Sequence, residues 1–156
     1  TRRSSDLGVS FDFLHPGNTR YKKRNNGSCV LLVRSKGGSL LLTGDIEKKI
    51  EKKLLKAQDE IADIDVLLVP HHGSKTSSSS SFIESVDPEI ALLSAGYKNR
   101  YRLPSKKVLA RYSTRDIKLF NTASSGAVTI TLRKGQPLDI RSHREQAKKY
   151  WLHVLP

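Results

Sequence analysis

The chain has 156 residues, of which 28 are Lys or Arg and 15 are Asp or Glu, so its formal net charge is +13. This length suits one domain with its own core. The single cysteine, Cys29, excludes an intrachain disulfide and a cysteine-rich zinc site, and the apolar run around it predicts a buried side chain. No membrane span or signal peptide is recognisable. The chain begins at Thr1, and we expect it to be part of a longer protein.

The excess of basic residues makes a polyanion the first partner to consider. Nucleic acid fits this charge, but an anionic lipid surface fits it too. A basic domain that merely repels its own copies is a further reading. Charge alone does not choose among these.

The first part of the chain predicts strands and one amphipathic helix. Residues 9–14 alternate between apolar and polar, which is typical of a half-buried strand. A basic loop at 16–27 ends in an Asn-Asn-Gly turn signal, and the apolar runs 29–33 and 39–42 predict a hairpin. From Ile46 the apolar residues recur at helical spacing, with lysines around the remaining faces.

Strand and helix alternate through the rest of the chain. We expect strands at 65–69, 90–93, 117–120, 127–132 and 138–140, and helices at 82–86 and 105–112. Residues 1–142 are therefore treated as one unit, and residues 143–156 as an appended tail that is first basic and then apolar.

Two polar clusters follow apolar strands of this pattern. Asp45 ends a Thr-Gly-Asp triplet, and His71 and His72 open a His-His-Gly-Ser segment after the strand at 65–69. Strand ends of α/β sheets are where ligands bind, and a carboxylate with imidazoles suits Zn²⁺, Mn²⁺ or iron. A bound divalent ion can lower the pKa of water towards about 7, which fits phosphodiester cleavage.

Each cluster also has a reading without metal. Asp45 directly precedes a predicted helix and could be its N-cap. His71 and His72 could be loop residues that hydrogen-bond to backbone. The metal reading gains from the combination, because one intervening helix brings both clusters to the same edge of a sheet.

The ordered series of motifs resembles the competence-related DNA-internalisation (ComEC) family of bacterial membrane proteins along most of residues 9–132. The matching segments are, in chain order, Phe13-Leu14-His15-Pro16, Asn26-Gly27-Ser28-Cys29-Val30-Leu31, Leu41-Leu42-Thr43-Gly44-Asp45-Ile46-Glu47, Val69-Pro70-His71-His72-Gly73-Ser74, Ser94-Ala95-Gly96-Tyr97-Lys98-Asn99-Arg100-Tyr101, and Thr122 with Gly126-Ala127. Each short motif alone is weak, whereas the series is specific.

The resemblance implies an α/β fold, namely the C-terminal half of a metallo-β-lactamase-type αββα sandwich. It implies two divalent ions, zinc or manganese, with Asp45 as the bridging ligand and His71 or His72 as the terminal one. No small-molecule organic cofactor is expected. Ser74 and Asn99 are expected to support the metal ligands or contact phosphate.

Two departures from the family pattern limit the expected activity. The usual upstream His-x-[His/Glu/Asp]-x-Asp-His cluster is not found in the chain, so at least half of the metal ligands are missing. Leu103 stands where the family usually has a histidine before proline. We therefore expect this chain to be inactive by itself. His15, next to Pro16, is expected to be structural rather than a ligand.

Basic and aromatic residues flank the predicted metal ligands. We expect nucleic-acid or phosphate contacts from Ser74, Lys75, Tyr97, Asn99, Arg100 and Tyr101. A positive groove with aromatic faces binds single strands without sequence readout. The alternative is a solvated, charged loop.

The leading hypothesis is part of a metal-dependent DNA phosphodiesterase or nuclease of a competence protein, acting on the non-transported strand. Its partners are single-stranded or duplex DNA and the rest of the same polypeptide, including a membrane channel. The parent is expected in the bacterial inner membrane, with this domain soluble and extracytoplasmic. The alternatives are a DNA-binding module of the same fold that has lost its chemistry, and a hydrolase of small phosphodiesters.

Overall fold

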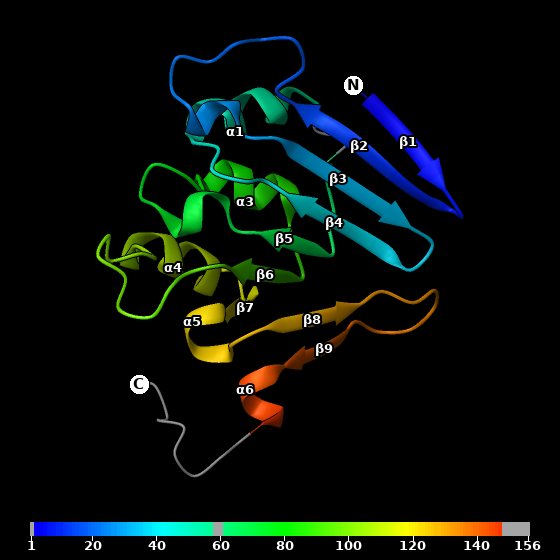
Figure 1. Cartoon of the computed structure of the whole chain (residues 1–156), viewed down its shortest axis with the longest axis vertical. Helices are drawn as coiled ribbons and strands as arrows, with labels where there is room; N and C mark the ends of the chain where they lie inside the picture. The colour runs from blue at the N-terminus through cyan, green and yellow to red at the C-terminus, as the bar shows by residue number, and fades with distance from the viewer. Residues whose placement is uncertain (1, 58–60, 148–156) are drawn as a thin grey trace.

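Two sheets and five short α-helices make up the computed structural model, which describes residues 2–57 and 61–147 (Figure 1). The larger sheet holds β1 (Arg2–Asp6), β2 (Val9–His15), β3 (Val30–Ser35), β4 (Gly38–Leu42), β5 (Val66–Leu68), β6 (Ile90–Leu93) and β7 (Lys118–Asn121), in that order. The smaller sheet pairs β8 (Val128–Thr131) with β9 (Asp139–Ser142). The helices are α1 (Lys48–Leu54), α3 (Ser80–Val86), α4 (Lys106–Ser113), α5 (Thr122–Ser125) and α6 (His143–Gln146).

The large sheet changes direction at β4. Strands β1 to β4 are antiparallel neighbours, whereas β4 to β7 are parallel and are joined through α1, α3 and α4. Parallel neighbours need such crossovers, because the chain must return to the starting edge of the sheet before the next strand can run in the same direction. The predicted alternation of strand and helix is confirmed, and the carboxyl ends of β4, β5 and β6 meet at one edge of the sheet.

The core lies between the helices and one face of the sheet. Leu32, Leu41 and Leu67 stand side by side in register on β3, β4 and β5, and all are fully buried. Ile50 of α1 and Phe82 of α3 belong to the same buried cluster. Alternate residues of a strand point to opposite faces, so these positions define the helix-covered face.

At β2 the opposite face of the sheet is apolar but poorly covered by the described residues. Phe11 pairs with Val33, and Phe13 pairs with Leu31. The two phenylalanine side chains remain 37% and 43% exposed. In a sandwich of two sheets such a face packs against a second sheet about 10 Å away. This arrangement is that of half a sandwich.

The structure departs from the predicted elements at several places. Strand β1 was not predicted, because its sequence has no apolar alternation. Helix α1 begins three residues after Asp45, with Glu47 at the N-cap, so the N-cap reading of Asp45 is wrong. Cys29 is exposed rather than buried. The start of the predicted tail forms α6, whose His143 N–H donates to the Ala127 carbonyl, and residues 148–156 lie outside the described residues.

Candidate metal centre and basic cleft

The turn after β4 holds Asp45 through the backbone and through two small side chains. Thr43 is buried and donates its hydroxyl to the Leu68 carbonyl (2.7 Å). Gly44 has φ +55°, and a Cβ there would lie 2.9 Å from that of Ser28. The Asp45 N–H donates to the Ser28 hydroxyl (3.2 Å), while the Asp45 carboxylate stays 41% exposed. These bonds fix the turn and leave the Asp45 carboxylate partly exposed.

The turn after β5 is left-handed over three residues. His71, His72 and Gly73 have φ values of 50°, 53° and 73°. This region is uncommon for residues other than glycine and costs on the order of 1–3 kcal/mol where the surroundings impose it. The His71 N–H donates to the Gly44 carbonyl (3.0 Å), which ties the two turns together.

The two histidines are held in different ways. Nδ1 of His72 lies 2.8 Å from the Ser94 carbonyl, and a carbonyl only accepts, so this nitrogen carries the proton. Nε2 of His72 then faces the Asp45 carboxylate at 3.3 Å. A histidine that donates its second ring N–H to a carbonyl is the usual arrangement of a metal ligand.

His71, by contrast, has both ring nitrogens engaged within the turn. Its Nε2 accepts from the Asn25 amide (3.1 Å), and its Nδ1 lies 3.3 Å from the Thr76 hydroxyl. The structure therefore brings both predicted histidines to the edge beside Asp45, but only His72 turns a nitrogen towards the carboxylate.

The spacing of the Asp45 and His72 donors fits a shared metal ion. Two ligand atoms bound about 2.1 Å from zinc at the tetrahedral angle lie about 3.4 Å apart. The observed distance between Oδ1 and Nε2 is 3.3 Å. Within the described part of the chain no group of three or more His, Cys, Asp or Glu side chains gathers around one point. Among the described residues Asp45 and His72 are thus two candidate donors, fewer than the four ligands of a tetrahedral zinc site.

A cleft of about 810 Å³ opens beside these donors. Its walls include three cationic side chains, Lys75, Arg102 and Lys106, and the hydroxyl of Ser105. Leu103 and Pro104 contribute apolar surface. A concave site that combines metal donors with several cations suits an anionic ligand.

Some of the residues predicted to contact nucleic acid line the cleft, and others do not. Ser74, Lys75 and Tyr101 line the cleft, whereas Tyr97, Asn99 and Arg100 do not. Ser74 bonds to the Thr76 hydroxyl (3.1 Å).

The Asn99 side chain forms hydrogen bonds within its own loop. Its amide NH₂ donates to the carbonyls of Gly96 and Leu103, and its amide oxygen accepts from the Leu103 N–H. These three bonds fix the loop that leads to Arg102 and leave no hydrogen of the NH₂ group for a phosphate.

Two cations of the cleft, Arg102 and Lys106, are not among the predicted site residues. Asn25, which belongs to the predicted turn signal, is a further residue of this kind, because it holds His71. The contact between Asn25 and His71 spans 46 positions, so only the folded chain reveals it. The Ser94 contact is made by a backbone carbonyl, for which the sequence carries no signal.

A buried carboxylate holds the serine segment that follows the histidine turn. Glu51 of α1 is fully buried and accepts from the backbone N–H groups of Ser78 and Ser79 (2.8 Å for Ser79). Burial raises the pKa of the Glu51 carboxyl, although these N–H bonds oppose the rise. Arg111 donates to the Ser78 carbonyl (2.6 Å) and Tyr112 to the Ser78 hydroxyl (3.2 Å). The segment after the histidines is therefore anchored to two helices.

Comparison with known proteins agrees with this fold. Residues 4–97, more than half of the chain, match the model of the metallo-beta-lactamase superfamily. The chain belongs to the metallo-β-lactamase superfamily. A crystal structure from Parabacteroides distasonis, described as a metal-dependent hydrolase, shares the fold with a TM-score of 0.50 at 11% sequence identity. The match covers 78% of this chain and 55% of that one, so the predicted half-sandwich is confirmed.

Relatives within this superfamily bear out the predicted resemblance to competence proteins. Competence protein ComA of Neisseria gonorrhoeae is 39% identical over 96% of this chain and 21% of its own length. Uncharacterized protein YcaI of Escherichia coli is 40% identical over 94% of the chain and 19% of its own length. ComE operon protein 3 of Bacillus subtilis is 38% identical over 77% of this chain and 15% of its own length. This metallo-β-lactamase unit thus spans about a fifth of the relatives it matches.

The structure adds one observation on membranes. Among the helices of residues 2–57 and 61–147, none is long and apolar enough to cross a bilayer.

Proposed function

We propose that this chain is part of a metal-dependent DNA phosphodiesterase that acts during competence on the strand that is not transported. The observation that carries the proposal is the approach of Asp45 Oδ1 to His72 Nε2 at the mouth of a basic cleft. Carboxylate and imidazole are donors for zinc or manganese, and the cations suit a phosphodiester. Competence proteins among the relatives support the biological setting.

In this proposal His72 is the terminal ligand and Asp45 the bridging one. A divalent ion held there would polarise a phosphodiester and lower the pKa of water towards about 7. The chain's own part is to orient the two donors and to place the anionic strand. Ser94 fixes the His72 ring, and Lys75 and Lys106 neutralise phosphate charge. His71 maintains the turn.

The remaining ligands are proposed to come from the other half of the sandwich. The uncovered sheet face with Phe11 and Phe13 is where that half would pack. The relatives are about five times longer than this chain, which leaves room for it and for a membrane channel. We propose an inner-membrane parent with this domain on the extracytoplasmic side, and an isolated chain without activity.

The test is cleavage of fluorescent single-stranded and duplex DNA by the full-length protein with added Mn²⁺ or Zn²⁺. Asp45→Asn should reduce the rate by at least a hundredfold. Glu89→Gln is the matched control, because Glu89 is exposed, lies outside the cleft and loses the same single charge. Undiminished cleavage by the Asp45→Asn protein would sink the assignment of the metal site.

A DNA-binding module that has lost its chemistry is the second candidate. It is favoured by Leu103, which lines the cleft where the resembled family usually has a histidine. A leucine cannot donate to or accept from a phosphate. Binding of DNA that needs no metal, together with absent cleavage in the full-length protein, would select this candidate.

A further inference from the structure

A second hollow adjoins the basic cleft. It has a volume of about 250 Å³ and is lined by Ser94, Ala95, Gly96 and Asn99 together with three residues that also line the cleft, namely His72, Tyr101 and Leu103. The two hollows therefore meet at His72 and Tyr101.

The two hollows differ in charge. Lys75, Arg102 and Lys106 line the larger one, whereas no Lys, Arg, Asp or Glu of the described residues lines the smaller. A nucleotide within a strand has the same asymmetry, because an anionic phosphate is joined to an uncharged aromatic base. We propose that the smaller hollow is a subsite for one nucleobase of a single strand, with Tyr101 as its stacking surface. This inference rests on the proposed function and extends it.

Tyr101 is placed to stack on a base at the junction. Its side chain is 66% exposed although it is large and aromatic. The Arg100 guanidinium lies over the ring, 4.7 Å from its centroid, and also donates to the phenolic oxygen. A guanidinium covers one face of a ring only, so the other face is available. Stacking of a base on an aromatic side chain contributes about 1–3 kcal/mol.

The loop that forms the subsite is shaped before any ligand binds. Asn99 bridges Gly96 and Leu103 across the loop, and Thr122 both accepts from the Ala95 N–H (3.0 Å) and donates to the Ala95 carbonyl (3.1 Å). A loop already held in its binding shape loses less entropy on association.

The same loop offers a matched control. Tyr97 is also exposed (52%) and also lies beneath a cation, since the Lys98 Nζ is 5.2 Å from its centroid. It lines neither hollow. Tyr97 and Tyr101 thus differ mainly in position, and only Tyr101 should contact a base.

The experiment measures binding of a short fluorescent DNA strand to the full-length protein, and of the same strand in which the central nucleotides lack their bases. Tyr101→Ala should weaken binding of the normal strand about fivefold or more and leave the abasic strand unchanged. Tyr101→Phe, which keeps the ring, should restore binding, and Tyr97→Ala should stay within twofold.

A second variant fills the subsite without touching Tyr101. A Cβ on Gly96 would meet only the Asn99 Cβ at 3.8 Å, so Gly96→Val should fold and occupy the hollow. This variant should weaken binding of the normal strand and leave binding of the abasic strand unchanged. Equal losses on both strands, or equal effects of the Tyr97 and Tyr101 variants, overturn the base subsite alone. A wild-type protein that binds neither strand overturns the proposed function as well.

Discussion

Asp45 and His72 face each other across the ends of two adjacent parallel strands, with 3.3 Å between the carboxylate Oδ1 and the imidazole Nε2. The contact exists because β4 and β5 end at one edge of the sheet and because the left-handed turn at 71–73 carries His72 back over Asp45. Ser94, at the end of the next parallel strand, fixes the ring from behind. Three consecutive strand ends therefore build the candidate metal centre.

His72→Ala should reduce the affinity of the full-length protein for Mn²⁺ or Zn²⁺ by about tenfold or more, because it removes a proposed ligand atom. His71→Ala should affect the metal less and stability more, by about 1 kcal/mol, since it deletes the bonds to Asn25 and Thr76. Competition with a chromophoric chelator measures the affinity, and His143→Ala, exposed on α6, is the control. A larger metal loss for His71→Ala would reverse the two roles.

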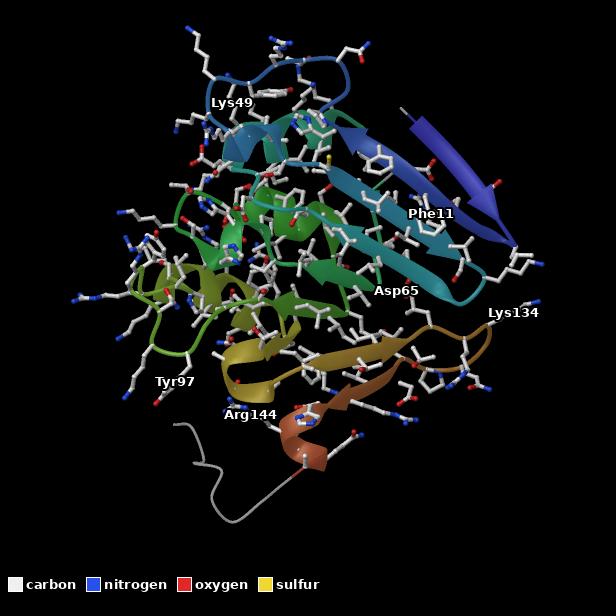
Figure 2. The ribbon with its side chains drawn as sticks, viewed as in Figure 1. Phe11, Lys49, Asp65, Tyr97, Lys134 and Arg144 are labelled. Carbon is white, nitrogen blue, oxygen red and sulfur yellow. The ribbon has the colours of Figure 1, made fainter. Side chains whose placement is uncertain are left out.

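Lys75→Ala and Lys106→Ala should each make binding of single-stranded DNA less dependent on salt. A cation that neutralises one phosphate contributes about 0.7 to the slope of log affinity against log salt on single strands. Lys134→Ala is the control, because Lys134 lies beyond β8 on the opposite side of the molecule from Tyr97 (Figure 2). Anisotropy titrations between low and moderate salt give the slopes. Equal slopes for all three variants would mean that the cleft does not hold the phosphates.

The placement of Asp45 beside the histidines could be predicted from the sequence, because apolar runs mark strands and a helix between them implies parallel pairing. The distinction between His71 and His72 could not, since it depends on backbone φ values and on a carbonyl that belongs to another strand. The role of Glu51 could not be predicted for a similar reason. It sits among lysines on what looks like a solvated helix face, and only the fold places Ser78 and Ser79 over it.

Glu51→Gln should lower the free energy of unfolding by about 1–3 kcal/mol. The carboxylate accepts from two backbone N–H groups, and an amide offers one oxygen, so one buried N–H loses its acceptor. Urea unfolding of the chain measures the change, with Glu84→Gln on the exposed face of α3 as the control, expected within about 0.5 kcal/mol. Equal stability of the two variants would show that Glu51 does not anchor the serine segment.

Gly73→Ala should be more damaging than Gly135→Ala, although both glycines have a φ near +70°. The left-handed backbone alone costs an alanine about 1–2 kcal/mol. At Gly135 no atom of the residues that the structure describes lies within 4 Å of an added Cβ, whereas at Gly73 that atom would lie 2.7 Å from the Pro104 Cβ and 2.9 Å from Leu93 Cδ1. The difference in melting temperature between the variants isolates the clash. Identical melting temperatures would mean that the loop at Pro104 moves to accommodate the added methyl group.

His15 should make the stability of the chain depend on pH. The residue is buried, as expected for a structural role, and its Nε2 lies 2.8 Å from the Asn26 carbonyl and so carries the proton. Among the described residues Nδ1 has no partner. Burial lowers the pKa of His15 below its ordinary 6.5, and the charge of Lys53 lowers it further, against the opposing effect of the Asn26 carbonyl.

Since the folded pKa of His15 is the lower one, the unfolded chain takes up a proton first as the pH falls. The contribution of this neutral histidine to the free energy of unfolding is therefore complete above pH 6.5. It decreases as the pH drops through that value, by no more than about 1.4 kcal/mol per pH unit. His15→Gln keeps a donor for the Asn26 carbonyl but cannot titrate. Urea unfolding at pH 7.5 and 5.5 should show a larger loss for the wild-type chain than for this variant, and an equal loss would mean that His15 takes up its proton equally in both states.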